Sequence, residues 1–314
     1  MTPRADVGAP NIDSPELWVA FLVGIFLVLA IDLTLWSRRD HGIRAAIGWS
    51  ALMIGLSLAF GAYLWRRYGS EAGLEFFAGY VLEESLSVDN LFVFVLLFQS
   101  FAIPPNYQHR VLFWGVLGAL VLRGSLIFAG VALVHHFRWV LVIFGAVLVY
   151  TAIKLALHRD EEERAPSDNP VVRFFRNHFP VTDTIEGPQF FVRRDGRRRA
   201  TPLFLAVIGA ETADLVFALD SIPAVFAVTD DSFLVFSSNI CALLGLRSLY
   251  FVVRGALARL RYLKPGLAAI LLFVGMKMVL YRWVHIPTGI SLLVIATILL
   301  AAIVYSWVHR DRPD

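Results

Sequence analysis

Acidic side chains inside two apolar segments are the residues of this sequence that could do chemistry. The two groups are Glu83, Glu84 and Asp89, followed by Asn90, and Glu211, Asp214 and Asp220, followed by Ser221. A charge at the centre of a bilayer costs roughly 2.5–3.5 kcal/mol on insertion scales, so such residues normally face a cavity or a partner. Because these side chains offer oxygen atoms and neither segment contains histidine, they favour a hard cation such as Mg²⁺, Ca²⁺ or Mn²⁺.

Basic residues follow the acidic groups in the same order twice. Arg123 and Lys154 come after the first acidic group, and Arg247 and Lys277 come after the second. The two basic residues are 31 positions apart in the first copy and 30 apart in the second. The surrounding sequences are also similar, as ALVLRGSLIF (119–128) and ALLGLRSLYF (242–251) show. Each base could still serve only to pair with an acid and lock two helices together.

This recurrence predicts an internal repeat of three helices, at about 76–157 and about 202–281. Since three is odd, the second copy must be inverted relative to the first, an architecture that places a polar site near the membrane midplane in many secondary transporters. The six acids and four bases sum to a charge of −2. A divalent cation would neutralise that charge.

Helix geometry adds a constraint on these acids. Glu83 and Asp89 are six residues apart, which leaves them about 120° apart around a continuous helix. They would share a site more easily if the helix were interrupted near them, so we expect a break at 84–90. Pro223 predicts a second interruption just after Asp220, because proline lacks the backbone N–H that a helix needs.

The composition requires a membrane environment for these residues. Apolar residues make up 58% of the 314 positions, charged residues 17%, and the mean hydropathy is +0.67. Such a chain is an all-α polytopic membrane protein, because lipid offers no partner for free backbone amides and barrel-like alternation is absent. We predict about nine transmembrane helices in one domain (17–308), at 17–36, 45–65, 76–102, 111–134, 139–157, 202–228, 232–253, 266–281 and 288–308.

Lysine and arginine in the connections indicate the orientation. With the N-terminal tail (1–16) outside the cytoplasm, the inner connections hold nineteen of these residues and the outer ones five, in line with the positive-inside rule. The first apolar segment is then a retained anchor that carries a further acid, Asp32, which could serve access, proton coupling or a structural pair. We expect the plasma (inner) membrane, with the C-terminal tail (309–314) in the cytoplasm.

The long connection 158–201 is therefore predicted to be cytoplasmic. Its segment QFFVRRDGRRRAT (189–201) places Asp195–Gly196 between two short extended runs, which predicts a hairpin. An arginine-rich hairpin could bind lipid headgroups or a partner, or act only as a topological anchor. The net charge of +3 has the same explanation, so no nucleic acid is expected. The single cysteine, Cys241, offers neither a disulfide framework nor a thiolate metal site.

Three long motifs resemble the TerC family, within the wider group of LysE-like transporters. They are EESLSVDNLFVF (83–94), TPLFLAVIGAETADLVFALDSIPAVFAVT (201–229) and FSSNICALLGLRSLYF (236–251). The resemblance implies manganese export, tellurium resistance in some members, and a supply of metal to secreted proteins in some bacteria. It also implies a role in metal handling for Glu83, Asp89, Glu211, Asp214 and Asp220, with Asn90 and Ser221 as adjacent polar groups.

We therefore expect alternating-access export of Mn²⁺ or a similar divalent cation, with proton coupling as a further hypothesis. The metal is substrate, and no catalytic cofactor or enzyme activity is expected. An intramembrane aspartyl protease is a competing class, because two helices carry acids, but its YD and GxGD motifs are absent. A third class is a non-transporting scaffold that binds metal or membrane-protein partners beside the secretion machinery.

Overall fold

The computed structural model describes most of the chain as a bundle of helices with one small hairpin. The described residues are 12, 14–36, 43–137, 139–157, 170–182, 185, 187–194, 197–253, 263–280, 283–284 and 286–308. Within the helices, the side chains of 33–36, 88–90, 92, 135, 247, 253, 263–264 and 307 lie outside this description. The predicted site residues Asp89, Asn90 and Arg247 are among them.

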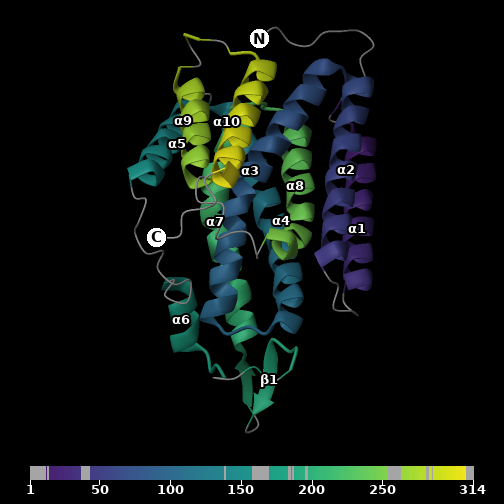
Figure 1. Ribbon diagram of the computed structural model, residues 1–314, viewed down its shortest axis with the longest axis vertical. Coiled ribbons are helices and arrows are strands. Elements are labelled where there is room, and N and C mark those ends of the chain that lie inside the picture. The colour runs from purple at the N-terminus through teal and green to yellow at the C-terminus, as the bar shows by residue number, and fades with distance from the viewer. Residues whose placement is uncertain are drawn as a thin grey trace.

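Helices account for nearly all of the described secondary structure. They are α1 (Pro15–Trp36), α2 (Ile43–Tyr68), α3 (Ser70–Ser100), α4 (Pro105–His136), α5 (Val140–Leu157), α6 (Pro170–His178), α7 (Pro202–Phe226), α8 (Ser232–Val253), α9 (Leu263–Val279) and α10 (Thr288–Val308). Two strands, β1 (Phe191–Arg194) and β2 (Arg197–Ala200), pair antiparallel. Figure 1 shows this hairpin and α6 together at one end of the bundle.

Each predicted span overlaps one helix of the structure, although not every one of these helices is both long and apolar enough to cross a membrane. Seven described helices are long and apolar enough to cross a membrane: α1, α2, α4, α5, α7, α8 and α10. Two helices are not among the seven: α3 is long enough but carries several acids, and α9 has only 17 residues. The chain is thus an all-α polytopic membrane protein, while the crossing of the membrane by α3 and α9 stays a prediction.

The bundle turns its apolar side chains outward, as lipid requires. Large apolar residues such as Val19, Phe26, Tyr150 and Leu293 are exposed on the outer helices. By contrast, charged groups are buried: Arg123 and Glu83 are 0% exposed. A polar interior inside an apolar exterior is the arrangement expected when ionisable residues in a membrane face the bundle interior.

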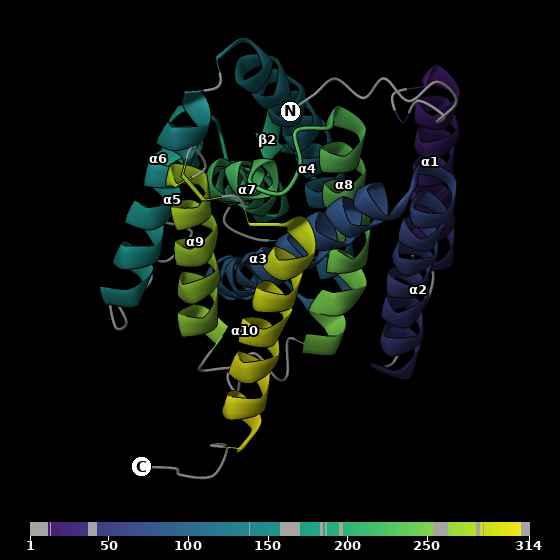
Figure 2. The same ribbon diagram turned by 90° about the horizontal axis from the view of Figure 1, so that it is seen from above.

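The central helices α3, α4, α7 and α8 pack against one another. In both views α5 and α9 lie side by side at one edge, and α1 and α2 lie at the opposite edge (Figures 1 and 2). The counterpart helices of the predicted repeat also touch, since α3 contacts α7, α4 contacts α8 and α5 contacts α9. Such contacts are compatible with inverted repeats, which remain a hypothesis.

A glycine pair explains how closely α5 and α9 approach. A Cβ atom on Gly275 would lie 2.9 Å from the carbonyl oxygen of Gly145, and one on Gly145 would lie 2.8 Å from the Cβ of Met278. Small residues let helix backbones meet in membranes, where packing rather than water exclusion holds helices together. This contact fixes the position of α5, which carries Lys154 and Thr151 towards α7.

The predicted break in the third span is wrong. The backbone of α3 is helical from Ser70 to Ser100, including 84–90. The interruption predicted at Pro223 is also wrong, because α7 runs on to Phe226. Pro223 lies three residues before the end of the helix, so its missing N–H weakens only the last turn. Both acidic segments therefore present their side chains from continuous helices.

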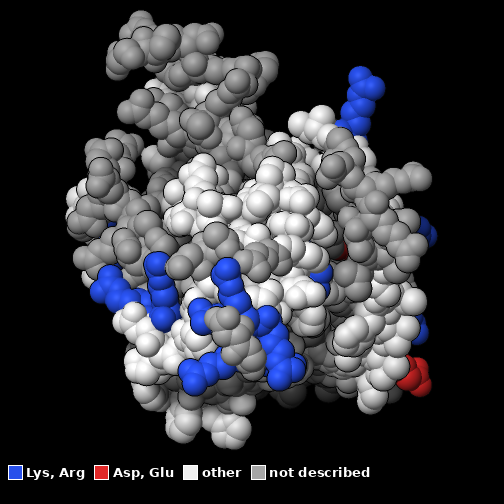
Figure 3. Space-filling model, turned by 90° about the horizontal axis from the view of Figure 1, so that it is seen from below, with Lys and Arg blue, Asp and Glu red and all other residues white. Residues whose placement is uncertain are grey.

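The connection before α7 forms the predicted hairpin and one additional helix. Arg193 lies opposite Arg198, and Arg194 lies opposite Arg197. The hairpin is attached to the bundle through aromatic rings, with the centroid of Phe191 4.6 Å from that of Phe204 on α7. Helix α6 was not predicted, and it packs on α7. Viewed from this end, Figure 3 shows the basic side chains gathered in one patch.

Candidate cation site

Arg123 of α4 is the centre of the buried polar cluster. Its Nε donates to both carboxylate oxygens of Asp214 at 3.1 Å, and its Nη2 lies 2.7 Å from Asp214 Oδ1. Its Nη1 forms an ion pair with Glu83 of α3. The same nitrogen lies 3.2 Å from Asn239 Oδ1 and 3.4 Å from Ser221 Oγ. One guanidinium thus joins α3, α4, α7 and α8.

Glu83 has a second partner in Asn239 of α8, whose Nδ2 donates to Glu83 Oε2 at 2.9 Å. Both side chains are fully buried. The cluster therefore contains two carboxylates and one guanidinium, of which only Asp214 is slightly exposed. Charge-assisted hydrogen bonds of this kind compensate for the cost of burying the charges only when each donor and acceptor has a partner.

Glu211 lies one helical turn before Asp214 on α7 and has a different environment. Neither of its carboxylate oxygens has a hydrogen-bond partner in the described part of the chain, although both atoms are buried. The carboxylate lies against Gly118 of α4, where a side-chain Cβ would overlap it. Because a buried polar atom without a partner is costly, this carboxylate is the natural position for a cation or a proton.

Asp220 occupies a separate position near the α5 side of α7. It accepts a hydrogen bond of 3.1 Å from Thr151 Oγ1 and interacts electrostatically with Lys154. Lys277 of α9 lies elsewhere, with its Nζ 2.9 Å from Ser291 Oγ on α10. The corresponding basic residues of the two predicted repeats therefore have different partners.

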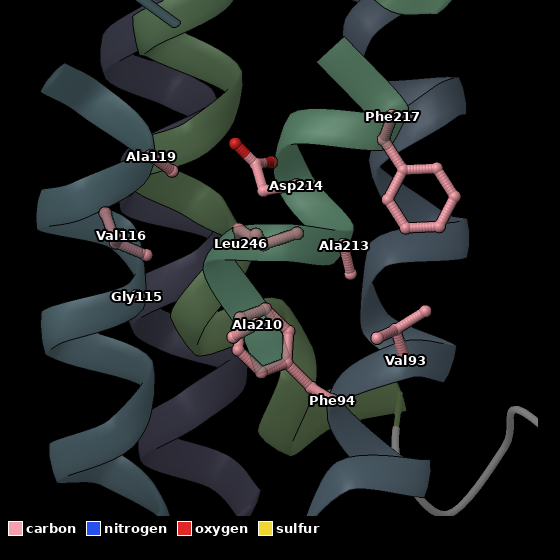
Figure 4. Close-up of a pocket in the computed structure, with 10 residues that line it drawn as sticks. All are labelled: Val93, Phe94, Gly115, Val116, Ala119, Ala210, Ala213, Asp214, Phe217 and Leu246. Atoms are coloured by element: carbon pink, nitrogen blue, oxygen red, sulfur yellow. The ribbon is translucent and has the colours of Figure 1, made fainter. Parts of the chain in front are cut away.

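A pocket extends from Asp214 towards the hairpin end of the bundle. Its lining is apolar apart from Asp214 and comprises Val93, Phe94, Gly115, Val116, Ala119, Ala210, Ala213, Phe217 and Leu246. Figure 4 shows Asp214 projecting from α7 towards the helix that carries Ala119, with the apolar residues around it. Gly115, Val116 and Ala119 of α4 precede Arg123, and Ala210 and Ala213 of α7 precede Asp214, while Phe217 follows it. Both helices begin at the hairpin end.

Asp32 lines a second pocket, between α1, α2, α4 and α8. Val116 borders both pockets. Asp32 is 9% exposed and does not belong to the cluster around Arg123. Glu84 is also separate, since it neighbours Tyr80 and its Oε2 is buried without a hydrogen-bond partner in the described residues.

The structure thus brings together only part of the predicted site. Glu83, Asp214, Ser221 and Arg123 meet directly, and Glu211 adjoins them. Five of the other predicted residues lie apart from this cluster: Asp220, Lys154, Lys277, Glu84 and Asp32. The structure does not describe the side chains of the last three, Asp89, Asn90 and Arg247. Among the described residues, no three acidic, histidine or cysteine side chains are arranged to hold a metal ion.

Two residues of these contacts were missed by sequence reasoning. Asn239 is an amide in an otherwise apolar stretch, next to Ser237 and Ser238. An amide buried in a membrane helix needs a partner for the same reason as a charge, and this signal could have identified it. Thr151 offers no comparable signal, because threonine in a membrane helix can satisfy its hydroxyl on the preceding turn.

Comparison with known proteins identifies the family to which the chain belongs. The model of the integral membrane protein TerC family matches residues 68–314. The chain is 48% identical to an uncharacterized membrane protein of Myxococcus xanthus, STKORF319, over 97% of this chain and 96% of the relative. No solved structure shows a significant match.

Relatives with a more specific name also match over nearly their full length. The chain is 45% identical to the Alx proteins of Salmonella typhi and Escherichia coli K12, with at least 95% of this chain and 97% of each relative covered. Their name proposes a membrane-bound redox modulator. With the family match over most of the chain and relatives at this identity, the chain belongs to the TerC family of integral membrane proteins.

Proposed function

We propose that this protein transports a divalent cation, Mn²⁺, out of the cytoplasm. The observation that carries the proposal is the excess of buried negative charge near one arginine. Glu83 and Asp214 pair with Arg123, and Glu211 interacts with Asp214 and lies against Gly118. Glu211 has two buried oxygens without partners in the described residues. With all four groups ionised the charge is −2, which one divalent cation neutralises.

The ligand chemistry supports a hard cation. The side chains facing this region offer carboxylate, amide and hydroxyl oxygens, which suit Mg²⁺, Ca²⁺ and Mn²⁺. The choice of Mn²⁺ among these ions rests on the resemblance of the motifs to the TerC family. The two neighbouring carboxylates Glu211 and Asp214 are three residues apart on α7, so they lie on one face of the helix.

The pocket below Asp214 supports a route from the cytoplasm. It leads towards the end of the bundle that carries the hairpin, and the arginine-rich connection is expected on the cytoplasmic side. In this orientation the chain lies in the inner membrane, with its N-terminus outside the cytoplasm and its C-terminus inside it. In this proposal, the two inverted repeats change their relative tilt and open the site alternately to each side.

Export can be tested in cells that lack their own manganese exporter. The intact chain is expected to lower total cell manganese and raise Mn²⁺ tolerance. Asp220 lies on the same helix as Glu211 and Asp214, beside Thr151 and Lys154, and Asp220→Asn tests whether the route also passes this acid. The variant removes a charge but keeps an acceptor for Thr151, so it should fold and export less than the intact chain. Asp230→Asn, in the connection before α8, is the matched control and should export normally.

Membrane levels of all three chains are measured in parallel. Equal manganese content in cells with the intact chain and cells with an empty vector would contradict export. Equal export by intact chain and Asp220→Asn would show that Asp220 is not part of the route. Because the two substitutions are chemically identical, only their position distinguishes them.

A scaffold role is the second candidate, and the arginine patch favours it. Exposed basic side chains from α6 and the hairpin gather on one face (Figure 3). Such a surface can attract an acidic partner. If scaffolding is the main role, a variant with glutamine in the hairpin should keep export and lose partner binding. The substituted positions are Arg193, Arg194, Arg197 and Arg198.

The matched control places glutamine at Arg66 and Arg67, two exposed residues at the end of α2. Partner binding is measured by crosslinking in intact membranes. Loss of export only in the hairpin variant would instead assign the arginines to insertion or transport. The redox role that the name of the Alx relatives proposes has little support from sulfur chemistry, because the single cysteine, Cys241, is buried and one chain can form no internal disulfide.

A further inference from the structure

Arg123 occupies the position at which a metal ion would meet Asp214. Both oxygens of Asp214 accept hydrogen bonds from the guanidinium, at 2.7–3.1 Å. Both oxygens of Glu83 are also engaged, one by Arg123 and the other by Asn239. In this arrangement a cation at Asp214 would have to share the carboxylate with the guanidinium, which already engages both oxygens and repels a second positive charge.

The polar groups around Arg123 are distributed unequally. Asp214 contacts the guanidinium through Nε and Nη2. Glu83, Asn239 and Ser221 all contact its Nη1. If the guanidinium withdrew from Asp214, one carboxylate and two neutral acceptors would therefore still hold it. Arginine remains charged under all ordinary conditions, so the exchange needs no change in its protonation.

Glu211 provides the position from which a metal could replace the arginine. It lies one helical turn from Asp214 and interacts with it electrostatically. Its two oxygens are buried and have no partner in the described part of the chain. A divalent cation held by Glu211 and Asp214 would be neutralised by these two acids, and Arg123 would be neutralised by Glu83. The loaded state is then balanced in charge, whereas the metal-free state, with all four groups ionised, carries −2.

We propose that Arg123 is a tethered counter-cation that competes with the transported metal for Asp214. In the metal-free state it closes the site, and in the loaded state it moves to Glu83, Asn239 and Ser221. This inference rests on the proposed cation transport and adds its order of events: a metal binds Asp214 only as Arg123 leaves, and the return of Arg123 expels the metal. Arg123 is a positioning residue that sets affinity and is not itself a metal ligand.

The test measures Mn²⁺ binding to the purified full chain in detergent. Binding is detected by electron paramagnetic resonance as a loss of the signal of free Mn²⁺. Arg123→Gln removes the competitor and should tighten Mn²⁺ binding about tenfold, within the usual range of coupling between two ligands. Arg123→Lys keeps the charge but loses the planar fork that binds Asp214, so it should tighten binding by a smaller factor. Both variants should export more slowly, because the metal is no longer expelled.

Arg110→Gln is the matched control. Arg110 lies on the same helix near the hairpin end, with its guanidinium 5.4 Å from the centroid of Phe190, and its replacement should leave Mn²⁺ affinity unchanged. A purely structural role for Arg123 predicts the opposite change, because a distorted site binds metal more weakly. Tighter binding together with slower export therefore distinguishes competition from support.

Folding of each variant is checked by size-exclusion chromatography. Unchanged or weaker Mn²⁺ binding by a monodisperse Arg123→Gln or Arg123→Lys would overturn the proposal. If Arg123→Gln does not fold, Arg123→Lys decides, and failure of both to fold would identify a structural ion pair and also overturn it. Absence of saturable Mn²⁺ binding by the intact chain would instead refute the proposed transport function, which is a separate result.

Discussion

Replacing Glu83 with glutamine is expected to reduce Mn²⁺ export to background and to destabilise the bundle. The carboxylate has two acceptor oxygens, one facing Arg123 and the other facing Asn239 Nδ2. A glutamine offers one oxygen and one NH₂ group, so one of the two donors must face another donor. An unsatisfied buried group of this kind costs about 1–3 kcal/mol.

The loss of export has a different cause from the loss of stability. Without the charge of Glu83, Arg123 has only Asp214 as an anionic partner among the described contacts of its guanidinium. The arginine should then stay on Asp214 and keep the metal out. Glu83→Gln is therefore expected to bind Mn²⁺ more weakly than the intact chain, whereas Arg123→Gln binds it more tightly.

Export from cells and thermal unfolding in detergent measure the two effects separately. Glu71→Gln is the control, because it makes the same substitution on the same helix at an exposed position in the first turn of α3. The control should match the intact chain in both assays. Normal export by a Glu83→Gln variant present at the same membrane level would contradict a role for Glu83 in the site.

Replacing Gly118 with alanine is expected to lower export about tenfold, which corresponds to ~1.4 kcal/mol, with little change in stability. A Cβ at this position would overlap the carboxylate of Glu211. The carboxylate is the flexible end of a side chain, so it should move aside while the helices stay in place. Glu211 would then lose the position next to Asp214 from which it can deliver a cation.

Gly115→Ala is the matched control for this prediction. Gly115 also lies on α4 and lines the pocket, but its Cβ would meet Phe94 at 3.4 Å, an ordinary contact. Its export should be nearly normal. The effect is assigned to Glu211 by a double-mutant cycle, since Gly118→Ala should add little in a Glu211→Gln background. Full additivity of the two substitutions would mean that Gly118 acts through another group.

The sequence by itself determined which segments are helices of membrane length and apolarity, and which residues are exceptional in them. Hydropathy located every membrane-length helix, because burial of apolar side chains in lipid is a local property of each segment. Asp195–Gly196 located the hairpin for a similar reason, since turn preference depends on neighbouring residues. The acids inside apolar helices were identified because a charged side chain is energetically costly in a bilayer.

Only the tertiary structure decided which charges meet. Arg123 contacts Glu83, Asp214 and Asn239 across 40, 91 and 116 positions of sequence. No pattern in the chain ranked these partners above Asp89 or Asp220, because helix packing sets the rotation and depth of each helix through contacts distributed along its whole length. The order of charges predicted equivalent roles for Lys154 and Lys277, yet Lys154 interacts with Asp220 on α7, whereas Lys277 interacts with Ser291 on α10 and Glu75 on α3. The composition therefore gave the kind of site, and the packing of α3, α4, α7 and α8 gave its geometry.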